Sequence, residues 1–136
     1  MDARPSAPVI QLAAWPLHAL AERGLDGECM SKLPGVIDHA RRLTNPVNRL
    51  DALEQLLHGV FPVEPARRLV LGELIAACRA ASSWKAPRCL ARTATLLGGA
   101  PDDVARVLAA LPEGPHRRQA ERVLAAGGAR PRRFFV

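Results

Sequence analysis

The sequence predicts an all-α protein of about seven helices, and three observations predict it. The 136 residues include 24 Ala and 19 Leu but only three Phe, two Trp and no Tyr, a composition that favours helices over sheets. Proline and glycine recur at helix-length intervals, as they do at helix starts and ends. The chain is 49 % hydrophobic and 24 % charged, as in globular domains. We therefore expect one helical domain over residues 9–128, after a flexible segment 1–8 and before a tail 129–136.

The opening of the domain predicts two helices. The first spans about residues 9–23, with a break at the pair Trp15-Pro16 and a stop at Gly24, because glycine tolerates the left-handed backbone beyond a helix end. The second is a short helix over about residues 34–43 that starts at Pro34, since proline suits the first helical position.

The third helix has the clearest signals. Asn45 can cap its first turn, and Pro46 can occupy the first helical position, where its missing N–H leaves no internal bond unmade. The helix then runs to about His58, and we expect Gly59 to supply the left-handed residue after its end.

Four more helices follow, and proline starts three of them. Aspartates directly after Pro101 favour a helix start, because carboxylates are stabilised at the positive end of the helix dipole. The predicted spans are about 65–81, 82 or 83 to 97, 101–111, and 115 to the glycine pair at 127. The apolar stripes of the helices place seven leucines inside: Leu50, Leu53, Leu56, Leu74, Leu90, Leu108 and Leu124.

A repeat appears when three of these helices are aligned on their terminal glycines. Each has the pattern R-x-x-A-x6-G, with a proline one to three residues before the arginine. The three sets are Arg49, Ala52 and Gly59, then Arg88, Ala91 and Gly98, and then Arg117, Ala120 and Gly127. Each helix follows a partner helix upstream, so the pattern predicts three helical hairpins over residues 35–127. One hairpin cannot bury its own apolar stripe, whereas stacked hairpins share a core.

This pattern resembles a degenerate α-solenoid unit of the HEAT or TPR-like kind, with an irregular period and without the aromatic signature of true TPR units. The resemblance implies a scaffold that binds other macromolecules, and it names no catalytic residue. A compact helical bundle is the alternative arrangement.

The repeated arginines Arg49, Arg88 and Arg117 allow two interpretations. In a stacked solenoid they could line up as a ladder that faces an acidic or phosphate-bearing partner. Alternatively, each could lie over its neighbouring hairpin and bond loop carbonyls or carboxylates, which is the usual reason for a polar residue to recur in register.

Basic charge gathers at the C-terminal end. Residues 1–116 carry 13 basic and 12 acidic side chains, whereas residues 117–136 carry six arginines and one glutamate. The six arginines are Arg117, Arg118, Arg122, Arg130, Arg132 and Arg133. Phe134 and Phe135 adjoin them and could insert into a partner's groove. Alternatively, arginines beside aromatic rings could track a nucleic acid.

No catalytic, metal or cofactor site is expected. The residues Cys29, Cys78 and Cys89 lack the C-x-x-C spacing of zinc sites, and the four histidines are scattered. Neither of the two lysines follows the glycine-rich turn of a phosphate loop. The cysteines are instead expected as free thiols in a reducing compartment.

We therefore expect a cytoplasmic, non-enzymatic protein-binding module, an adaptor, chaperone-like partner or assembly subunit, with no cofactor and no membrane span, as a monomer or homodimer. The alternative is a nucleic-acid-binding or ribonucleoprotein component that uses the arginine-rich C-terminal helix and tail.

Overall fold

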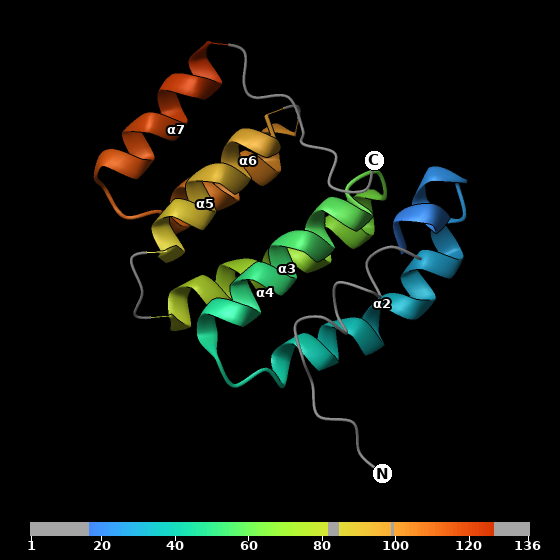
Figure 1. Ribbon diagram of the computed structural model, residues 1–136. Helices are drawn as coiled ribbons and strands as arrows, with labels where there is room; N and C mark the ends of the chain where they lie inside the picture. The colour runs from blue at the N-terminus through green and yellow to red at the C-terminus, as the bar shows by residue number, and fades with distance from the viewer. Residues whose placement is uncertain (1–16, 82–84, 99, 127–136) are drawn as a thin grey trace. The chain divides into compact units, whose positions relative to one another are not determined.

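The computed structural model describes residues 17–81, 85–98 and 100–126. In these ranges the chain is all-helical, as predicted, and it forms no strand. A helical turn at residues 17–22 precedes six helices (Figure 1). These helices are α2 (Asp26–Arg41), α3 (Pro46–Val60), α4 (Glu64–Ala80), α5 (Lys85–Leu96), α6 (Pro101–Ala110) and α7 (Pro115–Ala125).

The described chain divides into two compact units, with the boundary inside α4, between Leu74 and Ile75. Unit 1 contains the turn at 17–22, α2, α3 and the first part of α4. Unit 2 contains the end of α4 together with α5, α6 and α7. The prediction of a single domain over residues 9–128 stays a prediction, and each unit is described by itself below.

The helix α2 corrects the prediction of a short helix that begins at Pro34. It begins eight residues earlier, at Asp26, and Pro34 lies in its interior. A continuous stripe of buried residues at Cys29, Leu33, Ile37 and Ala40 runs along both sides of the proline. Burial of this stripe offsets the backbone hydrogen bond that proline removes, so packing overrides the local signal.

The helix α3 begins as predicted and ends later than predicted. The Asn45 side-chain oxygen accepts hydrogen bonds from the N–H groups of Val47 and Asn48, at 2.9 and 3.2 Å. Gly59 is not the left-handed residue after the helix, because α3 continues to Val60 and buries Gly59 within its last turn. The apolar stripe again continues past the expected stop.

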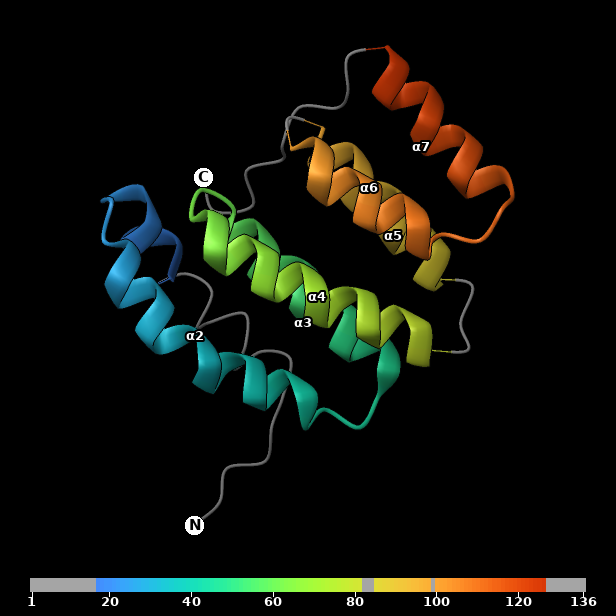
Figure 2. The ribbon, with the colours of Figure 1, turned by 180° about the vertical axis from the view of Figure 1, so that it is seen from behind.

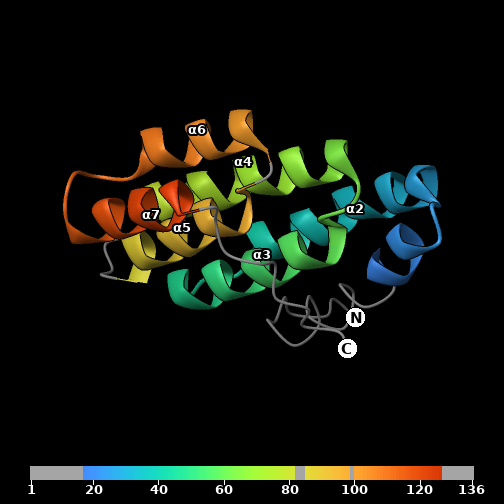
Figure 3. The same cartoon turned by 90° about the horizontal axis from the view of Figure 1, so that it is seen from above.

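In unit 1, α2 packs against α3 (Figure 1), and in Figure 2 the first part of α4 lies in front of α3. In Figure 3, α3 and the first part of α4 run side by side. The largest fully buried side chains of this unit come from all of its helical segments and from the connection between α3 and α4: Leu17, Leu33, Leu56, Leu57, Val60, Val63, Val70, Leu71 and Leu74.

Unit 2 is centred on α5, which packs against both α6 and α7 (Figure 1). This arrangement is consistent with either a hairpin stack or a compact bundle. Its core includes Cys89, Leu90, Leu97 and Val107. Of the seven leucines expected inside, the five before α6 are buried, whereas the last two are half-buried: Leu108 and Leu124.

Two glycines lie in the backbone region that glycine favours. Gly24 has φ of 72° just after the opening turn, which confirms the predicted stop there. Gly114 has φ of 155° and precedes Pro115, the first residue of α7. Gly24 lies in the left-handed region, whereas Gly114 is nearly extended with a positive φ, and a residue with a Cβ atom would be strained at either.

Candidate interaction surfaces

Two of the three repeated arginines hold the carbonyl group six residues before them. Arg49, in the first turn of α3, donates from Nε to the carbonyl oxygen of Leu43 at 3.2 Å, and a second guanidinium nitrogen bonds the same oxygen. Arg117, in the first turn of α7, donates to the carbonyl oxygen of Leu111 at 3.4 Å and to Glu121 at 2.9 Å. These are the loop-carbonyl contacts that form the alternative to an arginine ladder.

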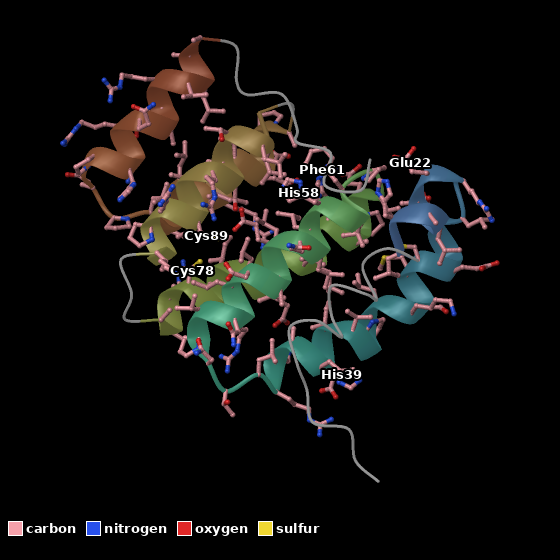
Figure 4. The ribbon with its side chains drawn as sticks, in the orientation of Figure 1. Glu22, His39, His58, Phe61, Cys78 and Cys89 are labelled. Atoms are coloured by element: carbon pink, nitrogen blue, oxygen red, sulfur yellow. The ribbon has the colours of Figure 1, made fainter. Side chains whose placement is uncertain are left out.

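A third arginine makes the same contact, and the sequence repeat did not include it. Arg67, near the start of α4, donates to the carbonyl oxygen of Phe61 at 3.0 Å, again six residues earlier. Its guanidinium carbon lies 5.3 Å from the centroid of the Phe61 ring, which is labelled in Figure 4. In all three contacts the bonded carbonyl group lies one or two residues past the end of the preceding helix, and an arginine of the next helix donates to it. We call these three contacts the arginine clasps.

The R-x-x-A-x6-G pattern is not required for a clasp. Arg67 forms a clasp although Val70, and not alanine, stands three residues after it. Arg88 has the pattern and is exposed on α5, and residue 82, six positions before it, lies outside the described residues. The sequence signal for a clasp is therefore an arginine near the start of a helix, seven or eight residues after the last residue of the preceding helix.

The remaining predicted partner-binding residues fall into two groups. Arg118 and Arg122 are exposed on α7, and Arg122 donates to the side-chain oxygen of Gln119 at 2.9 Å. The others lie outside the described residues: Arg130, Arg132, Arg133, Phe134 and Phe135. Partner binding by any of these residues stays a prediction.

A basic surface on α5 was not predicted from the sequence. Lys85, Arg88 and Arg92 are all exposed, and their spacing of three and four residues places them on one face. We call these three residues the α5 strip. The missed signal was an acid-free stretch, because the sequence has no aspartate or glutamate between Glu73 and Asp102. The charge count over residues 1–116 as a whole averages this basic stretch with the acidic residues on either side of it.

An apolar surface on α4 was also missed. Leu69 is 45 % exposed, the most exposed large hydrophobic side chain in the described ranges. Exposed Pro65 lies one turn before it, and half-exposed Gly72 follows at three residues. We call Pro65, Leu69 and Gly72 the α4 patch.

Ion pairs border the α4 patch on both sides. Arg68 pairs with Glu64 at 2.7 Å, with both side chains more than half exposed. On the other side, Glu73 accepts two hydrogen bonds from Arg41 of α2, one of them at 3.0 Å from Nε. This bond with Glu73, and then its charge, raise the pKa of Arg41. An apolar centre inside a polar rim is the common anatomy of a protein interface.

The titratable side chains of the described ranges form no metal centre. No group of three or more His, Cys, Asp or Glu residues is arranged there to hold an ion. The three cysteines are free and buried, and burial, followed by the nearby charge of Asp26, raises the pKa of the Cys29 thiol. Among the described helices, none is long and apolar enough to cross a lipid bilayer.

Comparison with known proteins gives no relative: no family model, no curated protein and no solved structure matches this chain.

Proposed function

We propose that this chain is a non-enzymatic, cytoplasmic interaction module that binds another protein through the α4 patch of unit 1. The observation that carries the proposal is the exposed Leu69 in a border of ion pairs. A reducing compartment suits the three free thiols, all of which are buried.

The partner's chemistry follows from this patch. Its contact segment has an apolar side chain that covers Leu69 and polar groups of both signs that meet the bordering ion pairs. Buried apolar anchors at the centre supply most of the binding energy of an interface, whereas rim charges mainly set encounter rate and specificity.

The arginine clasps support this role in unit 1. Arg49 of α3 bonds the connection that follows α2, and Arg67 of α4 bonds the residue directly after α3. Two successive interhelical turns are thus held by charged hydrogen bonds, which are stronger than neutral ones. A surface presented by pre-ordered helices loses less entropy on binding than one that must first become ordered.

Site-specific crosslinking tests the proposal. A photoreactive amino acid replaces Leu69 in the full chain, and a matched variant carries it at Leu25, the other exposed leucine of unit 1, which is 39 % exposed. We expect one protein to crosslink at position 69 and not at position 25. The crosslinked protein is then identified, purified and titrated against the unmodified chain.

Two further variants complete the test, Leu69→Gln and the control Leu25→Gln. We expect Leu69→Gln to weaken binding of the purified partner by about tenfold or more, as for an interface hot spot, and Leu25→Gln to leave it unchanged. Equal crosslinking at both positions, or equal affinity of both variants, would show that the α4 patch is not the interface.

A further inference from the structure

The α5 strip forms a line of positive charge along one helix. Lys85, Arg88 and Arg92 are exposed, and at 100° per residue they fall within an arc of about 60°. At a rise of about 1.5 Å per residue, the line extends for about 10 Å along the helix axis. The three side chains can therefore contact successive groups of one extended ligand.

The strip has no acidic residue on its own helix, because the sequence of α5 contains neither Asp nor Glu. The described residues of unit 2 contain four acidic side chains: Asp102, Asp103, Glu113 and Glu121.

The two units differ in net charge as a result. The described residues of unit 1 carry seven basic and eight acidic side chains, a net charge of −1. Those of unit 2 carry eight basic and four acidic side chains, a net charge of +4. Three of the eight basic residues of unit 2 form the α5 strip.

The chemistry of the strip indicates which kind of ligand it suits. In the described ranges the exposed large hydrophobic residues are Leu25 and Leu69, both in unit 1. The strip thus offers charge without the apolar anchor that dominates protein interfaces. Two of its three residues are arginines, whose planar guanidinium groups match phosphate oxygens in pairs.

We propose that the α5 strip binds the phosphate backbone of a nucleic acid without reading its sequence. This inference does not depend on the proposed protein-binding function, which concerns a different helix face in the other unit. It also differs from binding by the C-terminal arginines, because none of the three strip residues belongs to that cluster.

Fluorescence anisotropy tests the inference with the full chain. The probes are a labelled 20-base-pair DNA duplex and a labelled 20-nucleotide single-stranded RNA, titrated from 50 to 200 mM salt. The test variant is Lys85→Gln with Arg88→Gln and Arg92→Gln. The matched control is Arg79→Gln with Arg106→Gln and Arg42→Gln, which removes the same charge from exposed sites on α4, on α6 and directly after α2.

We expect the unmodified chain to bind at least one probe. Three phosphate contacts give a slope of log affinity against log salt of about −2 for the single strand or about −2.7 for the duplex. The strip variant should lose at least about tenfold in affinity at 100 mM salt, together with most of this slope. The control should retain the slope and lose less than about threefold. Matching thermal melting curves for all three chains establish that each is folded.

Four results would overturn the inference. They are no binding of either probe by the unmodified chain, equal losses in the strip variant and its control, a slope that disappears only when the chain is truncated after Gly128, and polyglutamate binding as tight as that of the nucleic acids. The third result would show that the C-terminal tail binds the phosphates. The fourth would show that the strip binds any polyanion and has no preference for phosphate.

Discussion

Arg67 and Arg68 are neighbours in the sequence and make different contacts. Arg67 is half-buried, bonds the carbonyl oxygen of Phe61 and lies over its ring. Arg68 is exposed and pairs with Glu64 on the same helix. A substitution of the first leaves a partly buried carbonyl group without its charged donor, whereas a substitution of the second removes only an exposed pair.

This difference predicts unequal stability effects. We expect Arg67→Ala to lower the free energy of unfolding by about 1 to 2 kcal/mol, as for loss of a hydrogen bond to a charged group. Arg68→Ala should change it by less than about 0.5 kcal/mol. Urea unfolding followed by circular dichroism measures both. Equal effects would show that the clasp at Phe61 does not contribute to stability.

Cys29 provides a second prediction at the scale of one residue. Burial, and then the charge of Asp26, raise the pKa of its thiol, so it stays protonated near neutral pH and reacts slowly, because the thiolate is the nucleophile. In the folded chain, alkylation of Cys29 at pH 8 should be at least about tenfold slower than in the denatured chain. Peptide mass spectrometry over time measures this rate, and similar rates in the two states would contradict the assigned environment.

The same shift fixes the sign of a pH effect on stability. The folded-state pKa lies above that of the unfolded thiol, so folding favours the protonated form. The stability that Cys29 contributes is therefore fully present below about pH 8.5, the usual thiol pKa, and is lost as pH rises through the folded-state pKa.

At the scale of helices, local sequence signals predict where a helix starts better than whether a proline or a glycine ends it. The Asn45-Pro46 start was correct because its two signals act within one turn, and the structure shows both hydrogen bonds of the Asn45 cap. The start of α2 was missed because Leu25 offers no capping side chain there. Local signals predict helix boundaries at Pro34 and Gly59, yet both residues lie inside helices whose apolar stripes continue past them. Such packing depends on distant residues, so local signals do not reveal it.

Alanine substitutions at two glycines, one inside α2 and one directly before α7, should change the stability of the chain in opposite directions. Gly35 is exposed inside α2, and a Cβ atom there would meet nothing within 4 Å. Gly35→Ala should therefore stabilise the chain by about 0.5 to 1 kcal/mol, because alanine loses less backbone entropy in a helix.

Gly114 also has open space around it, but its φ of 155° strains any residue with a Cβ atom. Gly114→Ala should destabilise the chain by about 1 kcal/mol or more. Thermal unfolding of the two variants measures both changes. Stabilisation by Gly114→Ala would contradict the backbone conformation described before α7.

At the scale of the whole molecule, the two proposed binding surfaces differ in chemistry, and each lies in a different unit. Unit 1 presents the apolar α4 patch, and unit 2 presents the cationic α5 strip. From the sequence, the all-helical class and most of the leucine core could be predicted, because composition and periodicity determine them. The α4 patch could not, because which face of α4 stays uncovered depends on how the other helices pack. The α5 strip could have been found, since its acid-free stretch is visible in the sequence.

Titration of the purified, crosslink-identified protein partner against three forms of the chain tests the central claim most directly. The forms are the unmodified chain, Leu69→Gln, and the triple α5 variant with Lys85→Gln, Arg88→Gln and Arg92→Gln. The account predicts that calorimetry will show affinity at least about tenfold weaker for Leu69→Gln and unchanged for the triple α5 variant. Unchanged affinity in Leu69→Gln, with loss of binding in the triple variant, would contradict the claim that the α4 patch is the protein-binding surface.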